Sequence, residues 1–82
     1  MAKSKDPRHV GYINRATRIT SDGLQWIVKT KSGNRWKTRS FVSSTKSVLL
    51  RCLRELGRTP DKRGSATLEK LPDTFAAWAA KN

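Results

Sequence analysis

The clearest alternation of hydrophobic and polar positions in the chain lies between residues 24 and 42. Leu24, Trp26 and Val28 occupy every second position, which is the period of a strand with one buried face. A second alternating stretch begins at Arg35, and Gly33 and the residues beside it are typical of a tight turn. The pattern predicts two antiparallel strands, over residues 24–31 and 35–42.

The length of the turn decides which side chains share a face, because a slip of one residue moves every side chain to the other side. A three-residue loop from Ser32 to Asn34 predicts a core face with Leu24, Trp26, Val28, Trp36 and Val42. It gathers five basic side chains on the opposite face, namely Lys29, Lys31, Arg35, Lys37 and Arg39. A two-residue loop would put Lys37 and Arg39 beside Trp26, where burying charge is costly. We therefore expect the three-residue loop and a basic face that binds a polyanion. A face that is merely solvated is the alternative, although such faces usually mix charges of both signs.

Residues 10–20 predict a further strand, joined to residues 24–31 through a turn at Asp22 and Gly23. Pairing across a two-residue turn puts three side chains on the core face: Ile13, Thr17 and Ile19. It puts three others on the basic face: Tyr12, Asn14 and Arg18. Arg15 then falls on the core side, so we place it at the sheet edge with its charge in water. The expected sheet is a three-stranded antiparallel meander.

A helix is predicted over residues 45–56, because hydrophobic residues recur there at helical spacing: Leu49, Cys52, Leu53 and Leu56. Ser43, Ser44 or Thr45 can cap its start, and Gly57 suits the left-handed cap at its end. The helix should cover the core face of the sheet, which gives an α+β fold.

The last part of the chain predicts a loop followed by short helical elements. Pro60 and Gly64 favour a loop over residues 58–65, and Pro72 separates a turn near 66–70 from a helix over 73–80. Asp73 can cap this second helix. We expect Phe75 and Trp78 to pack on the first helix or a sheet edge; a helix with exposed aromatic side chains that binds a partner is the alternative.

Net charge is the property of the composition that says most about the binding partner. The 82 residues, enough for one small domain, have a formal net charge of +12. No acidic residue lies between Asp22 and Glu55. Such an imbalance favours nucleic acid as a partner, and after it an anionic membrane or an acidic protein. Residues 1–8 predict a disordered basic arm before a single domain over residues 9–82.

The residues offer little chemistry for catalysis or metal binding. Cys52 is the only cysteine and His9 the only histidine, which excludes an internal disulfide and a zinc site of the usual tetrahedral kind. The acidic residues are scattered, and no glycine-rich phosphate loop is present. We expect a non-enzymatic protein without a cofactor. The sequence also lacks a membrane-spanning apolar run and an apolar leader, so we expect an intracellular, cytoplasmic protein.

Binding roles can be assigned to the basic strands from side-chain geometry. Arginine and amide side chains make paired hydrogen bonds to base edges, and the candidates are Arg18, Arg35, Arg39, Asn14 and Gln25. Lysine acts as a point charge, so Lys29, Lys31 and Lys37 are expected to contact phosphates. The predicted nucleic-acid site consists of Arg18, Gln25, Lys29, Lys31, Arg35, Lys37 and Arg39.

Part of the chain resembles a known DNA-binding fold. The matching stretches are 26–28 (Trp-Ile-Val), 33–35 (Gly-Asn-Arg), 40–44 (Ser-Phe-Val-Ser-Ser) and the helix over 48–56, within residues 11–57. They resemble the GCC-box-binding domain of plant ethylene-response factors and are similar to the N-terminal arm-binding domain of phage and transposon integrases. The resemblance implies a sheet in the DNA major groove, a helix behind it, and groove-facing positions at Arg18, Gln25, Lys29, Arg35, Lys37 and Arg39. The helix lacks the alanine-rich face of those families, residues 58–82 have no counterpart, and no recombinase domain follows, which implies a stand-alone binding module.

Together these observations predict a small protein that binds duplex DNA, such as an accessory or regulatory factor of a phage or mobile element. One alternative is a protein that binds an acidic surface of a host nucleic-acid enzyme and inhibits it. Another is an RNA-binding protein, because exposed aromatic side chains on a basic face stack on unpaired bases. With Trp26 and Trp36 both expected inside, and only Tyr12 and Phe41 outside, duplex DNA is the expected partner.

Overall fold

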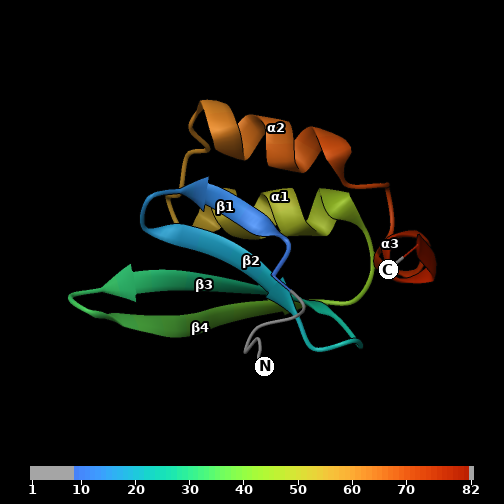
Figure 1. Ribbon diagram of the computed structural model, residues 1–82, viewed down its shortest axis with the longest axis horizontal. Coiled ribbons are helices and arrows are strands. Elements are labelled where there is room, and N and C mark those ends of the chain that lie inside the picture. The colour runs from blue at the N-terminus through green and yellow to red at the C-terminus, as the bar shows by residue number, and fades with distance from the viewer. Residues whose placement is uncertain (1–8, 82) are drawn as a thin grey trace, which may run out of the picture.

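A computed structural model describes residues 9–81 of the chain; the predicted basic arm, residues 1–8, and residue 82 lie outside the described residues. The fold is α+β, with one antiparallel sheet of strand order β1-β2-β3-β4 and three helices (Figure 1). The elements are β1 (Gly11–Asn14), β2 (Thr17–Ser21), β3 (Trp26–Ser32), β4 (Arg35–Val42), α1 (Lys46–Glu55), α2 (Lys62–Lys70) and α3 (Phe75–Lys81).

The prediction of one strand over residues 10–20 was wrong, because this segment folds back on itself as β1 and β2. The side-chain oxygen of Asn14 accepts a hydrogen bond of 2.9 Å from the backbone N–H of Ala16, which closes the turn. Arg15 lies in this turn and is exposed. A continuous strand placed Arg15 on the core side only because the turn was not recognised. The sheet therefore has four strands, not three.

The connection between β2 and β3 is longer than expected, since Ser21 pairs with Trp26 across residues 22–25. Lengthening the loop from two residues to four leaves the faces unchanged, because the side-chain period of a strand is two. Ile13, Thr17 and Ile19 are accordingly buried, as predicted. Leu24 lies in the loop and is 75% exposed, so its predicted place in the core was wrong.

The turn between β3 and β4 has two residues, Gly33 and Asn34, and not the expected three, since Ser32 pairs with Arg35. Gly33 has a φ of 63°, which a glycine adopts without steric cost. This register continues to Lys29, opposite Thr38, and then shifts by one residue. Beyond the shift, Val28 pairs with Ser40. The extra residue on β4 is Arg39, which makes this a β-bulge.

A two-residue turn was rejected because it would have put basic side chains beside Trp26 in the core. The bulge prevents this, because residues of β4 before and after it alternate between the two sides of the sheet in different phase. Trp26 pairs with Val42, so the core end of the hairpin has the expected hydrophobic face. Nearer the turn, Lys31 pairs with Trp36, and Trp36 therefore lies on the face away from the core. The predicted burial of Trp36 was wrong, and it failed because one constant register was assumed along the whole hairpin.

Trp26 lies at the centre of the hydrophobic core and is fully buried. The rings of Phe75 and Trp78, from α3, contact it edge-on, with centroid distances of 5.5 Å and 6.4 Å. Phe75 and Trp78 were expected on the first helix or a sheet edge; they pack instead on Trp26, whose strand β3 lies inside the sheet. The rest of the core comes from both layers: Ile13, Ile19, Val28, Val42, Leu49, Leu53, Leu68 and Leu71.

Helix α1 is confirmed within a residue or two of its predicted bounds and lies behind the sheet (Figure 1). The hydroxyl of Thr45 caps it by accepting a hydrogen bond of 3.3 Å from the N–H of Val48. Leu49 and Leu53 are buried on the face toward the sheet. Gly57 follows the helix with a φ of 72°, the left-handed conformation expected of its cap.

Helix α2 was not predicted in full, because Gly64 was interpreted as a helix breaker. The helix begins after Asp61, whose carboxylate accepts a hydrogen bond of 2.8 Å from the N–H of Gly64. Gly64 is buried against β1, where a Cβ atom would overlap the carbonyl oxygen of Ile13. The glycine is thus required by a close approach between helix and strand.

The start of α3 is tied to the start of α1. The backbone N–H of Lys46 donates to the carbonyl of Asp73 at 2.7 Å, and Phe75 N–H donates to the carbonyl of Ser44 at 2.9 Å. Thr74, and not the predicted Asp73, caps the helix, accepting a hydrogen bond of 3.1 Å from the N–H of Ala77. Helix α3 is thereby fixed at the end of the molecule opposite the β3–β4 turn (Figure 1).

Candidate nucleic-acid interface

Strands β2, β3 and β4 carry basic side chains, and none of the four strands carries an acidic one. The basic residues are Arg18, Lys29, Lys31, Arg35, Lys37 and Arg39. The described acidic residues all lie in loops, helices and helix caps, outside the strands. The sheet is therefore a surface of one charge sign, which a solvated face of a soluble domain usually is not.

The sheet has an outer face, which we define as the side turned away from α1. Strand pairing places Arg18 opposite Lys29 and Lys31 opposite Trp36 on this side. The outer face carries Tyr12, Arg18, Ile27, Lys29, Lys31, Trp36, Thr38 and Phe41. Three of the seven predicted site residues, Arg18, Lys29 and Lys31, thus lie together on it.

Arginines and aromatic rings form a contiguous layer on the outer face. The guanidinium of Arg18 lies 4.6 Å from the centre of the Trp36 ring, and Arg63, from α2, lies 4.8 Å from that of Tyr12. The Tyr12 and Trp36 rings meet edge-on at 6.1 Å. The Arg18 Nε is buried and has no hydrogen-bond partner in the described part of the chain. We call Tyr12, Trp36, Arg18 and Arg63 the aromatic layer.

The remaining basic residues of β4 lie on the other side of the hairpin. Lys37 pairs with Thr30, whose side chain is buried on the core side of the sheet, and Arg35 shares that side. The Arg39 Nε donates a hydrogen bond of 2.8 Å to the hydroxyl of Thr30. The predicted single face with five basic residues was therefore wrong. Near the tip, the two-residue turn places the basic side chains of β3 on the outer side of the hairpin and those of β4 on the core side.

The result is a hairpin with cations on both sides. Its turned end extends beyond the helices in Figure 1. Lys31, Arg35, Lys37 and Arg39 are all exposed, and Lys29 is half-buried. The charges around the tip can thus approach a polyanion from two directions.

Two residues that were expected to contact bases have structural partners instead. The amide of Gln25 donates a hydrogen bond of 3.0 Å to the carboxylate of Asp22, in the loop at the end of β3 farthest from Gly33. The amide of Asn14 donates one of 3.0 Å to the carbonyl of Thr59. Gln25 is thus separated from the other predicted site residues, and the groove-facing set implied by the family resemblance does not form one surface.

The Asp22 carboxylate accepts several hydrogen bonds within its own loop. The backbone N–H of Leu24 donates to it at 2.9 Å, and this hydrogen bond, followed by that from Gln25, lowers the pKa of the Asp22 carboxyl. The negative charge organises the loop between β2 and β3. It does not neutralise the strands.

Two residues of this region, Trp36 and Arg63, were misplaced from the sequence, whereas Phe41 was expected outside. Trp36 was assigned to the core, although the tight-turn signal of Gly33 and Asn34 also allowed the outward register. Phe41 is 59% exposed, on the same side as Trp36. Arg63 was placed in a loop, and no local pattern indicates that it reaches Tyr12 across the end of α2.

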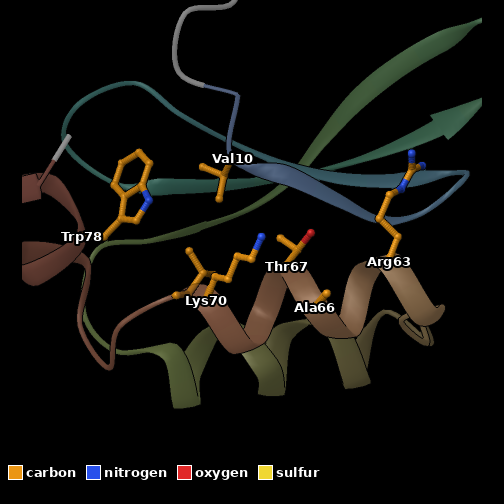
Figure 2. Close-up of a pocket in the computed structure, with 7 residues that line it drawn as sticks. Val10, Arg63, Ala66, Thr67, Lys70 and Trp78 are labelled. Carbon is orange, nitrogen blue, oxygen red and sulfur yellow. The ribbon is translucent and has the colours of Figure 1, made fainter.

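A hollow of about 260 Å³ lies between β1, α2 and α3. Figure 2 shows Trp78 and Lys70 directed toward the space beside Val10, with Arg63 at the far end of α2. Arg63 thus lines the hollow and also covers the Tyr12 ring on the outer face. The hollow extends the cationic surface around the β1 edge of the sheet.

No family model, curated protein or solved structure matches this chain. The resemblance to the ethylene-response and integrase domains therefore stays a prediction. Residues 9–81 contain no group of three or more potential metal ligands. None of the helices described is long and apolar enough to span a membrane.

Proposed function

We propose that the protein is a non-enzymatic nucleic-acid-binding module that uses its β-sheet. The observation that carries the proposal is the combination of acid-free strands with cations on both sides of a hairpin that extends beyond the helices. Binding phosphates with such cations releases condensed counterions, which drives association.

The two-sided arrangement favours nucleic acid over an acidic protein surface. Lys31 points to the outer side of the hairpin and Lys37 to the inner side, so one flat partner surface cannot neutralise both. A phosphate backbone can follow the hairpin around its tip, and a nucleic-acid groove can enclose a two-stranded ribbon. The inhibitor of a host enzyme is therefore the weaker candidate.

Separate roles follow from how firmly each cation is held. Lys31, Arg35 and Lys37 are exposed, which suits phosphate contacts. Arg18 is stacked on Trp36 and Arg39 is hydrogen-bonded to Thr30, so their guanidiniums are positioned before any ligand binds. Pre-positioned groups lose less entropy on binding.

The structure removes one reason for expecting duplex DNA. The preference for a duplex over unpaired strands depended on both Trp26 and Trp36 being buried, whereas Trp36 belongs to the outer face with Tyr12 and Phe41. Nucleic acid as the partner is unaffected, because the strands carry the same number of cations whichever side Trp36 occupies.

Removing charge from the hairpin should weaken binding more than removing it from a helix. We expect Arg35→Ala with Lys37→Ala to weaken binding to any polynucleotide by about tenfold at moderate salt. The matched control is Arg51→Ala with Arg54→Ala, two exposed arginines of α1, with the same loss of net charge. Fluorescence anisotropy with a labelled oligonucleotide measures both pairs.

Equal losses in the two pairs would mean that only net charge matters and that the sheet is not the interface. Tighter binding to an acidic protein or to polyglutamate than to nucleic acid of equal charge would favour the inhibitor hypothesis. Circular dichroism melting of each variant controls for folding.

A further inference from the structure

The outer face has aromatic side chains that phosphate binding does not use. Phe41 is 59% exposed and lies opposite Ile27. Trp36 is half-buried and lies on the same side of the same strand. Large exposed apolar side chains are otherwise scarce among the described residues, where Leu24 in the β2–β3 loop is the other one.

We propose that the outer face binds unpaired nucleotides of a single-stranded nucleic acid, with bases stacked on Trp36 and Phe41. This inference rests on the proposed function and specifies its ligand. Aromatic rings gain contact from the faces of bases, and every base has such a face. In a duplex those faces are covered by neighbouring base pairs, and only the base edges can be reached in the grooves. The aromatic component of the surface therefore matches unpaired nucleotides.

The spacing on β4 suits a short segment of a single strand. Trp36 and Phe41 are five residues apart, which corresponds to roughly 15 Å along a strand. That distance is about four nucleotides at the ~3.4 Å that one strand advances per nucleotide in a stacked helix, and fewer in an extended strand. Lys29 and Thr38 face each other between the two aromatic residues, where they can contact the intervening phosphates.

The arginines of the aromatic layer contribute to the same surface. Guanidinium planes stack on bases as aromatic rings do, and the Arg18 guanidinium already lies over the Trp36 ring, 4.6 Å from its centre. Neither Arg18 nor Arg63 forms an ion pair within the described part of the chain. Their charge is thus available to the ligand.

The experiment compares three ligands of equal phosphate number: a single strand with bases, an abasic single strand, and a duplex. We expect the single strand with bases to bind at least about tenfold more tightly than the abasic strand, because stacking adds to the phosphate contacts. Its binding should also quench tryptophan fluorescence, while the abasic strand should not. Equal affinity for the abasic strand, or a preference for the duplex, would overturn this inference and leave the proposed function standing.

Phe41→Leu is the sharpest variant, because an exposed side chain can be replaced without disturbing the core. We expect it to weaken binding of the strand with bases by about tenfold and to leave abasic binding unchanged. Leu24→Ala is the matched control, since it changes an apolar side chain that is 75% exposed and lies in the β2–β3 loop, outside the strands.

Trp36→Leu should have the same selective effect as Phe41→Leu, and Trp36→Phe should restore most of the affinity. If Trp36→Leu lowers the affinity for the oligonucleotide with bases and for the abasic one equally, Trp36 has a purely structural role as the support of Arg18. Failure of all three nucleic acids to bind would contradict the proposed function itself.

Discussion

Trp26 connects the sheet to the C-terminal helix, because its fully buried indole contacts both Phe75 and Trp78. We expect Trp26→Ala to lower the free energy of unfolding by about 3–5 kcal/mol, as for other large aromatic truncations in a core. In a domain of this size such a loss removes much of the total stability. Chemical denaturation followed by circular dichroism measures it, and an unchanged midpoint would show that the α3 contacts contribute little.

The substitution Gly64→Ala tests the contact between α2 and β1, because the contact determines whether the free energy of unfolding rises or falls. In an open helix, glycine to alanine is stabilising by about 1 kcal/mol. Here the added methyl would overlap the backbone oxygen of Ile13, which cannot rotate away, so we expect Gly64→Ala to destabilise by about 1–3 kcal/mol.

The neighbouring Ser65→Ala is the control for Gly64→Ala, because Ser65 is exposed on the same helix. It should leave the melting temperature nearly unchanged. An increase in melting temperature for Gly64→Ala would contradict the close helix–strand contact.

Arg39 and Arg35 differ in what their side chains do in the unbound protein. The Arg39 Nε satisfies the hydroxyl of Thr30, which is fully buried, whereas Arg35 is exposed beside the turn. We expect Arg39→Ala to cost about 0.5–1.5 kcal/mol of stability, the usual net value of one hydrogen bond. Arg35→Ala should cost close to nothing. Urea unfolding of both variants decides the point, and equal midpoints would mean that the Thr30 contact is not formed in solution.

At the level of elements, the β3–β4 hairpin determines which surface the protein presents. Its two-residue turn sends Trp36 outward, and the bulge at Arg39 returns Val42 to the core. One strand thereby contributes to the outer face and to the core without burying a charge. The bulge also separates the basic residues of β3 and β4 near the tip, so that they surround the hairpin and do not crowd one face.

The sequence predicts elements well where one periodic pattern covers a whole element. Leu49 and Leu53 indicated α1 correctly, and the alternation around Trp26 and Val28 indicated the buried face of β3. The errors arose where a single residue changes the pattern. Arg39 inserts a bulge, and Gly64 marks a close contact that resembles a helix break.

The candidate site was predictable in composition but not in arrangement. Charge alone indicated the basic strands, and all six of their cations were named. Which side each cation occupies depends on the bulge, and a bulge has no reliable local signal. The contact of Arg63 with Tyr12 depends on how α2 packs on β1, which is a property of tertiary structure.

On the scale of the whole molecule, charge is distributed unevenly over the elements. The strands are purely basic, whereas α1 and α2 each carry an acidic residue among their basic ones. The net charge of +12 opposes close association of two copies through their sheets in the absence of a polyanion. If the proposed function holds, the same field should accelerate encounter with nucleic acid at low ionic strength.

We propose that the cations around the β3–β4 hairpin bind the phosphates of a nucleic acid. The most direct test is the salt dependence of the affinity for a single-stranded oligonucleotide, measured for the native protein and for a variant with Lys29, Lys31, Arg35 and Lys37 changed to glutamine. With four or five phosphates neutralised, log K should fall against log salt with a slope of about −3 to −3.5, and the variant should retain a slope between zero and about −1. A slope near zero in the native protein, or the same slope in both proteins, would contradict the claim.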